Sequence, residues 1–284
     1  GTDGVLLAAA TDAALGQGLL SGGALTLSTG GALTVSSALS VTGDTSVTSG
    51  GALATSAATS VTGALSMSVT GAMTVGAAIQ ASSTSSISAT GALSLNANLA
   101  VTGAQKTLDV AALSVAMASN AVSVTTNAGD MRLTATGGNL SLSTVSTVNG
   151  ADKAKVALVA SGAILDQNAS SLISASTLWM DAGTGMGLSG NAINTGVDTL
   201  ALKSTSGDVW VTQATALTID AVSVSVGPTG SLSTVSGQNI TVGGAGNLVL
   251  TVTTGDLTLA TTSSNTQTIG GNALMSVLSG SFLS

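Results

Sequence analysis

The chain has 284 residues, of which 44% are apolar, 1% aromatic and 6% charged. It has 12 acidic and 5 basic residues and a net charge of −7, which argues against a basic surface that could bind nucleic acid. The absence of cysteine excludes disulfides and thiolate metal sites. A mean hydropathy of +0.59 argues against disorder. We therefore expect a folded chain with an aliphatic core and a neutral surface of Ser, Thr, Asn and Ala.

The first segment, residues 1–22, contains VLLAAATDAALGQGLL at residues 5–20. It permits two interpretations, a short cap or the first turn of the architecture that follows. The sequence does not begin with Met, and it has no signal-peptide pattern and no run of apolar residues long enough to span a bilayer, so we expect no membrane insertion and interpret it as a mature product or an internal piece of a longer chain.

Residues 23–122 are the most regular part of the chain, and they repeat with a period of about 20 residues. Between the glycines lie three short segments per unit with alternating apolar and polar residues, such as Leu25-Thr26-Leu27, which is the period of a strand with one buried face. Two glycine series run through the units: Gly31, Gly51, Gly71 and Gly91, and Gly23, Gly43, Gly63 and Gly103, with Ser83 in place of one member.

Three short strands in each repeat unit, separated by glycine corners, predict an all-β fold, a right-handed parallel β-helix or β-solenoid with triangular coils. About 14 coils stacked about 4.8 Å apart would form a rod of roughly 65 to 70 Å. The repeat predicts two interior columns: Leu33, Leu53, Met73, Leu93 and Leu113, and Val35, Thr55, Val75, Leu95 and Val115. It places Thr34, Ala54, Thr74, Ser94 and Ser114 on an outer face.

Residues 123–284 are less regular, but we expect one continuous solenoid over residues 1–284. Gly187, Gly207, Gly227 and Gly246 are spaced almost evenly, close to the period of the earlier units, which indicates that the coil register continues. The segment from Asn149 to Lys155 is charged and is interpreted as an excursion from a corner.

The sequence resembles the repeat regions of filamentous-haemagglutinin-type exoproteins. The resemblance rests on Gly-(Asp/Asn/Ala)-Leu-x-Leu units, on residues 161–219 with Ala-Ile-Leu-Asp, Leu-Trp-Met-Asp-Ala-Gly-Thr-Gly and Ser-Gly-Asp-Val-Trp-Val, and on the closing GNLVLTVTTGDLTLATT. It implies a β-helix of a bacterial cell-surface or secreted fibre, extracellular and often exported by two-partner secretion, with a structural or adhesive role. The family's Asn-Pro-containing secretion motif is missing, which puts export of this piece by itself in doubt.

We expect no enzyme, no cofactor and no catalytic or metal-ligating residue. Histidine and tyrosine are absent, and only five aspartates lie densely enough to be imagined as a group: Asp166, Asp181, Asp198, Asp208 and Asp220. Aspartate beside glycine, as at 129–130, 207–208 and 255–256, is typical of a corner that bonds nearby main chain. Calcium at such corners stays an alternative, although no calcium-binding repeat motif occurs. The separation of Trp179 and Trp210 in the sequence is not a multiple of the repeat, which favours packing in the interior or at a corner over a shared aromatic platform.

Two alternatives to a passive fibre stay open. A flat Ser/Thr face could bind ice or crystalline polysaccharide, and outer positions 26, 46, 66 and 86 read Thr, Ser, Ser and Ser. A solenoid also exposes unpaired strand edges at its first and last coils. We therefore expect partners end to end, either neighbouring segments of the same long chain or copies of the chain, and a host or environmental surface or glycan as a further partner.

Overall fold

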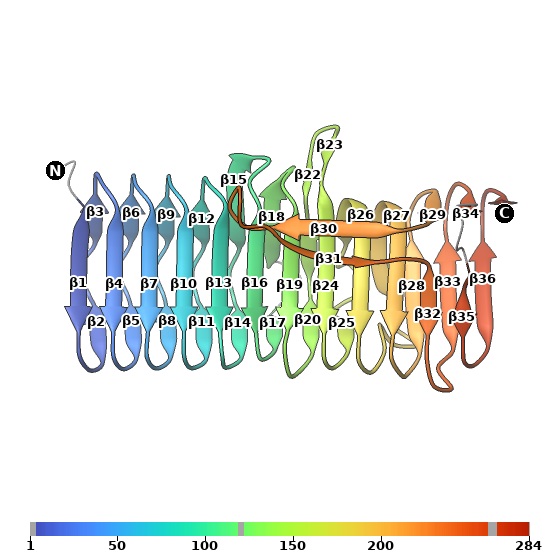
Figure 1. Ribbon diagram of the computed structural model, residues 1–284, viewed down its shortest axis with the longest axis horizontal. Coiled ribbons are helices and arrows are strands. Elements are labelled where there is room, and N and C mark those ends of the chain that lie inside the picture. Colours follow the sequence, from blue (N-terminus) through green and yellow to red (C-terminus); the bar gives the residue numbers. More distant parts are fainter. Residues whose placement is uncertain (1–3, 119–121, 261–265, 284) are drawn as a thin grey trace.

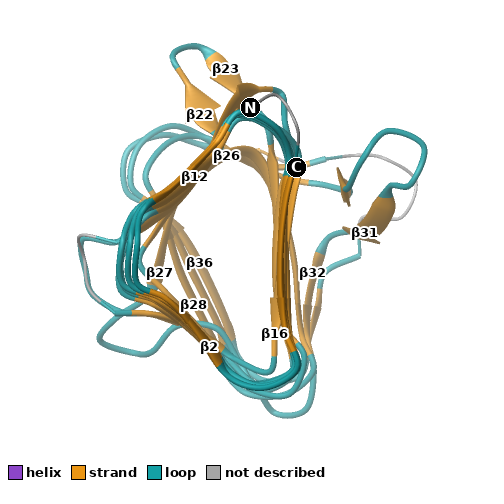
Figure 2. Ribbon diagram, turned by 90° about the vertical axis from the view of Figure 1, so that its left-hand side faces the viewer, coloured by secondary structure: helices purple, strands orange, loops and turns teal. Residues whose placement is uncertain are grey.

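The computed structural model describes residues 4–118, 122–260 and 266–283, and it confirms the β-solenoid. The chain winds through about 12 coils of parallel strands, and the described residues contain no helix. Figure 1 shows the coils side by side along the rod, with the two termini at opposite ends. Seen from the N-terminal end, the path is triangular and runs clockwise as it recedes, so the solenoid is right-handed (Figure 2).

Three faces make up the triangle. Face 1 contains β1 (Val5–Ala9), β4 (Leu25–Thr29), β7 (Thr45–Ser49), β10 (Leu65–Val69), β13 (Ser85–Ala89), β16 (Leu108–Ala112), β19 (Met131–Ala135), β24 (Lys155–Ala160), the second halves of β26 (Ile173–Ala182) and β27 (Ile193–Ser204), β32 (Ile240–Val242) and β35 (Thr268–Ile269).

Face 2 contains β2 (Ala13–Leu15), β5 (Leu33–Val35), β8 (Leu53–Thr55), β11 (Met73–Val75), β14 (Leu93–Leu95), β17 (Val115–Met117), β20 (Leu140–Leu142), β25 (Ile164–Asp166), a bridge at Met186, β28 (Val209–Gln213), β33 (Leu248–Val252) and β36 (Ala273–Val277). Face 3 contains β3 (Leu19–Ser21), β6 (Leu39–Val41), β9 (Thr59–Val61), β12 (Ile79–Ala81), β15 (Leu99–Ala104), β18 (Ser123–Asn127), β21 (Thr144–Ser146), the first halves of β26 and β27, β29 (Leu217–Ile219), β34 (Leu257–Leu259) and β37 (Phe282–Leu283).

Two antiparallel hairpins project from the solenoid without interrupting its ladder. The first joins β22 (Val148–Asn149) to β23 (Asp152–Lys153), and it confirms the corner excursion predicted for this segment. The second joins β30 (Val222–Val226) to β31 (Ser233–Gly237) and lies outside face 1. Figure 2 shows both outside the triangle.

Residues 5–21 form the first coil of the solenoid and not a separate cap. Residues 5–21 form β1, β2 and β3, which pair in parallel with β4, β5 and β6. This segment is a coil of the solenoid.

The interior columns are confirmed up to the fifth coil. Leu33, Leu53, Met73 and Leu93 stack in register, and all four are buried. Leu113 was assigned to this column wrongly, because it is 46% exposed and the partner of Leu93 is Val115. Met117 follows Leu95 in the second column, and Ala116 takes the outer place predicted for Ser114.

The shift arises at a corner that is longer than its predecessors. Thr45 pairs with Leu65 in the regular coils, whereas Ser85 pairs with Leu108, so the coil that begins at Ser85 contains more residues than the coil that begins at Thr45. The added residues form a turn at Gln105, which has a φ of +59°. A fixed period therefore misplaces every position after this corner.

Longer corners raise the average to about 22 residues per coil, which gives about 12 coils in place of 14. The largest insertion separates Leu202 from its partner Ile240 and contains the β30–β31 hairpin. Gly227 lies at the end of β30 in this hairpin, so its spacing to Gly207 and Gly246 does not mark a coil, and that part of the predicted register was wrong. Twelve coils predict a rod of about 58 Å.

The glycine series has a steric reason at the corners. A Cβ atom on Gly91 would lie 2.6 Å from the Ala72 amide nitrogen of the preceding coil, which is closer than side-chain carbon atoms approach. Because glycine has no Cβ atom, successive corners can pack in direct contact, and the strands on either side remain at hydrogen-bonding distance.

Candidate functional surfaces

The five aspartates considered as a group do not converge. Asp166 accepts hydrogen bonds from the Asn168 amide and the Asn194 side chain, and Asp198 pairs with Lys153 at 2.8 Å. Asp181 lies in face 1 opposite Lys203 of the next coil. Residues 4–118, 122–260 and 266–283 contain no cluster of three or more His, Cys, Asp or Glu side chains that could hold a metal ion.

The corner role of aspartate beside glycine is confirmed by hydrogen bonds between coils. In each case a side-chain oxygen accepts the amide N–H of a residue in the following coil. The pairs are Asp12 with Ala32 (2.7 Å), Asp44 with Ala64 (2.8 Å), Asp130 with Lys155 (3.0 Å), Asn139 with Ala163 (2.8 Å), Asp208 with Asn247 (2.8 Å), Asn247 with Asn272 (2.9 Å) and Asp256 with Ser281 (2.7 Å). These aspartate and asparagine side chains therefore link successive corners, and Asp12, which has no glycine neighbour, does the same.

The β30–β31 hairpin, here called the strap (residues 222–237), crosses the outside of face 1. In Figure 1, β30 runs across the strands of the solenoid toward the N-terminal end and β31 returns. Val222, Val224 and Val226 form a second apolar cluster with three outward-facing residues of consecutive coils: Ala157 of β24, Trp179 of β26 and Ala201 of β27. Trp179 is only 6% exposed because the strap covers it, so it packs against the outer surface of a face, and the predicted interior or corner position was wrong.

Hydrogen bonds hold the strap against face 1 at its end and along one edge. Thr107 Oγ1 accepts the Gly227 amide N–H at 3.1 Å, and Lys155 Nζ donates to the Ser223 carbonyl at 3.1 Å. Arg132 bonds Asp109 of the neighbouring coil through two nitrogens, at 2.9 and 2.6 Å, and donates to Ser233 Oγ at 2.8 Å. The repeat gave no indication of this hairpin, although the alternating VSVSV, the GPTG turn and the following polar strand are a hairpin signature in hindsight.

Trp210 lies on another face. It follows Val209 in β28 and lines a recess of about 290 Å³ with Leu188, Asn191, Asn194 and Thr212. The two tryptophans therefore do not share a platform.

The part of face 1 that the strap leaves uncovered carries a grid of hydroxyl groups. It is formed by two outward positions in each of β4, β7, β10 and β13, and parallel pairing places them in columns along the rod. The members of this hydroxyl grid are Thr26, Ser28, Ser46, Thr48, Ser66, Ser68, Ser86 and Ser88.

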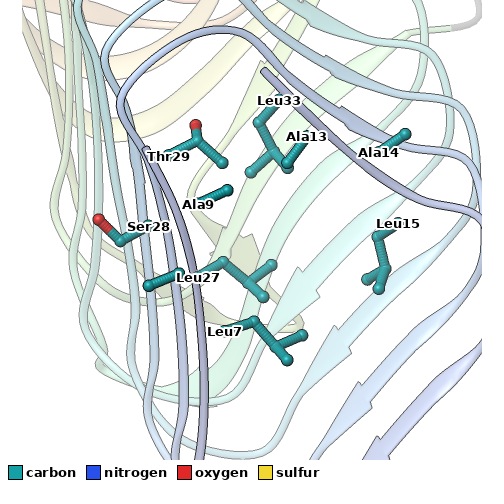
Figure 3. A pocket seen from close by; sticks show the side chains of 10 residues that line it. Leu7, Ala9, Ala13, Ala14, Leu15, Leu27, Ser28, Thr29 and Leu33 are labelled. Atoms are coloured by element: carbon teal, nitrogen blue, oxygen red, sulfur yellow. The ribbon is translucent and has the colours of Figure 1, made fainter. Parts of the chain in front are cut away.

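The end coils expose apolar side chains. At the N-terminal end, Leu7, Leu15, Leu27 and Leu33 surround an opening of about 270 Å³ into the solenoid core, which Figure 3 shows from close by. At the C-terminal end, Leu274, Leu278, Phe282 and Leu283 are between 45% and 69% exposed.

No protein-family model, no curated protein and no solved structure matched the chain in comparisons with known proteins. A search of the described residues for a helix long and apolar enough to cross a membrane found none.

Proposed function

We propose that this chain is a structural, non-catalytic rod segment of a bacterial cell-surface or secreted fibre, with an adhesive role. The observation that carries the proposal is the parallel ladder of about 12 coils, with aliphatic columns inside and mainly small uncharged side chains outside. Such a ladder resists bending, because the strands of each coil pair in parallel with those of its neighbours on three faces. The resemblance to filamentous-haemagglutinin-type repeats supports the same role and an extracellular location.

The end coils support a partner at each end of the rod. Unpaired strand edges and exposed side chains at inward-facing positions, such as Leu7 at 40% and Phe282 at 49%, favour association with another coil. That coil belongs either to a neighbouring segment of the same long chain or to another copy.

Two measurements test this proposal. Immunogold electron microscopy of the native cells, with antibody against residues 4–118, should label fibres outside the cell, and label confined to the cytoplasm would contradict the location. The purified chain should release no product from a panel of polysaccharides, and appearance of new reducing ends or unsaturated sugars would contradict the non-catalytic role.

The hydroxyl grid favours a second candidate, which is binding of ice or a crystalline polysaccharide. Its columns repeat at about 4.8 Å along the rod, and the alternating positions of a strand are about 7 Å apart, which provides a flat lattice of hydroxyl groups. Ser66→Lys with Ser86→Lys should abolish inhibition of ice recrystallisation or binding to crystalline cellulose or chitin, while Ser60→Lys on face 3 should leave it unchanged. Absence of both activities in the unsubstituted chain would exclude this candidate.

A further inference from the structure

The free end of the strap and the β22–β23 hairpin border an open polar pocket at the corner between face 3 and face 1. Its volume of about 500 Å³ lies within the range of small-ligand sites, roughly 300–1,000 Å³. The floor comes from the corners of consecutive coils, including Gln105, Lys106 and Ala128, and one wall comes from the strap at Ser225, Gly227 and Thr229.

The pocket concentrates the positive charge of an acidic protein. Lys106, Lys153 and Lys155 line it, and they are three of the five basic residues in a chain whose net charge is −7. We refer to this site as the lysine pocket.

The local charge balance favours a singly charged anion. The Lys153 ammonium is paired with Asp198, and Asp130 is the acidic residue of the pocket lining, with its Oδ1 accepting the Lys155 amide N–H. Three ammonium groups against these two carboxylates leave one net positive charge. Lys106 is exposed and has no ion pair in the part of the chain that the structure describes.

Two further features are typical of a built site. Gln105 and Ala128, with φ of +59° and +51°, are two of the three non-glycine residues with left-handed backbone in the described chain, and both line the lysine pocket. Such strained conformations gather at binding sites. In addition, Thr84, Thr107, Ser176 and Thr229 line the same pocket. The hydroxyl oxygens of Thr84, Thr107 and Ser176 already bond main-chain groups, but each keeps a lone pair that can accept a hydrogen bond from a ligand hydroxyl.

We propose that the lysine pocket binds the carboxylate of an acidic sugar, with Lys106 and Lys155 contacting the carboxylate and the threonine and serine hydroxyls contacting the sugar ring. The proposal does not depend on the fibre function. The same carboxylate chemistry is present in a free uronic acid and in a uronate polysaccharide, and the test separates these sources.

Isothermal titration calorimetry on the full chain would use glucuronic acid, a galacturonic acid trisaccharide, the corresponding neutral sugars and acetate. We expect both uronates to bind, the neutral sugars to bind at least tenfold more weakly, and affinity to fall as salt is raised. Tighter binding of the trisaccharide than of the monomer would assign the site to a polysaccharide, and equal binding would assign it to the free acid. Equal binding of neutral and acidic sugars, or no binding of either uronate, would overturn the proposal.

Matched variants locate the binding. Lys106→Gln should weaken uronate binding about tenfold, whereas Lys203→Gln, which removes the same charge from an exposed position of β27 outside the pocket, should leave it unchanged. Fluorescence of Trp179 in a Trp210→Phe background would verify that the strap stays in place in each variant. Equal loss of binding in both lysine variants would show that net charge alone acts, and it would refute a site at this pocket.

Discussion

The third coil of the solenoid carries three buried hydroxyl groups that have no hydrogen-bond partner. Thr45 of β7, Thr55 of β8 and Thr59 of β9 point inward from the three faces and are at most 3% exposed. The adjacent coils place apolar residues above and below each of them: Leu25 and Leu65, Val35 and Val75, and Leu39 and Ile79. The coil is therefore a polar layer within an aliphatic column.

Replacement of each threonine by valine should stabilise the protein. A buried hydroxyl without a partner costs about 1–3 kcal/mol, and valine fills nearly the same space with a methyl group. We expect Thr55→Val and Thr59→Val each to raise the free energy of unfolding by about 1–2 kcal/mol. The triple variant should gain less than the sum, because the three side chains share one coil.

Urea unfolding followed by far-UV circular dichroism measures the change, and amide hydrogen exchange of the second to fourth coils shows whether it is local. Thr59→Ser keeps the hydroxyl and removes a buried methyl group, so it should lower stability by about 1 kcal/mol. Thr34→Val on the exposed side of β5 should change stability by less than about 0.5 kcal/mol. Unchanged or reduced stability of Thr55→Val and Thr59→Val would show that these hydroxyls are satisfied in the core, and it would refute the reasoning.

Three other predictions concern the column, the corners and the strap. Met73→Ala removes a fully buried side chain between Leu53 and Leu93 and should cost about 2–5 kcal/mol in urea unfolding; a cost below about 1 kcal/mol would contradict the packed column. Asp44→Ala should lose about 0.5–1.5 kcal/mol, because the Ala64 amide loses its acceptor, while Asp44→Asn should keep most of the stability. Gly237→Val should displace the strap and shift Trp179 emission to longer wavelength, because a Cβ there would lie 2.1 Å from the Trp179 ring; the exposed neighbour Ser236→Val should leave the emission unchanged.

The sequence predicted the coil because the determinants of the first five coils are local and periodic. Alternation in segments such as Leu33-Thr34-Val35 identifies which side chains are inside, and the glycine series identifies the corners. Both signals repeat with the same period. The sequence therefore predicted that equivalent residues of successive coils stack on one another.

The later part could not be predicted at the same level, because the length of a corner is not visible in the alternation. An added turn at Gln105 leaves each strand looking the same while moving Leu113 out of the column. The position of the strap depends on contacts across the outer surface, such as Val224 with Trp179, which join residues far apart in the chain. The lysine pocket was missed for the same reason, since the strap forms one of its walls.

Distances along one outer column test the stacked-coil account most directly. The absence of cysteine lets spin labels be attached at single introduced thiols, and face 2 aligns Ala14, Thr34, Ala54, Thr74, Ser94, Ala116 and Ser141. Double electron–electron resonance should give about 19 Å between positions 14 and 94, and about 29 Å between 14 and 141, because each coil adds about 4.8 Å. Broad distributions, or a second distance that does not exceed the first by about 10 Å for these two coils, would contradict the solenoid.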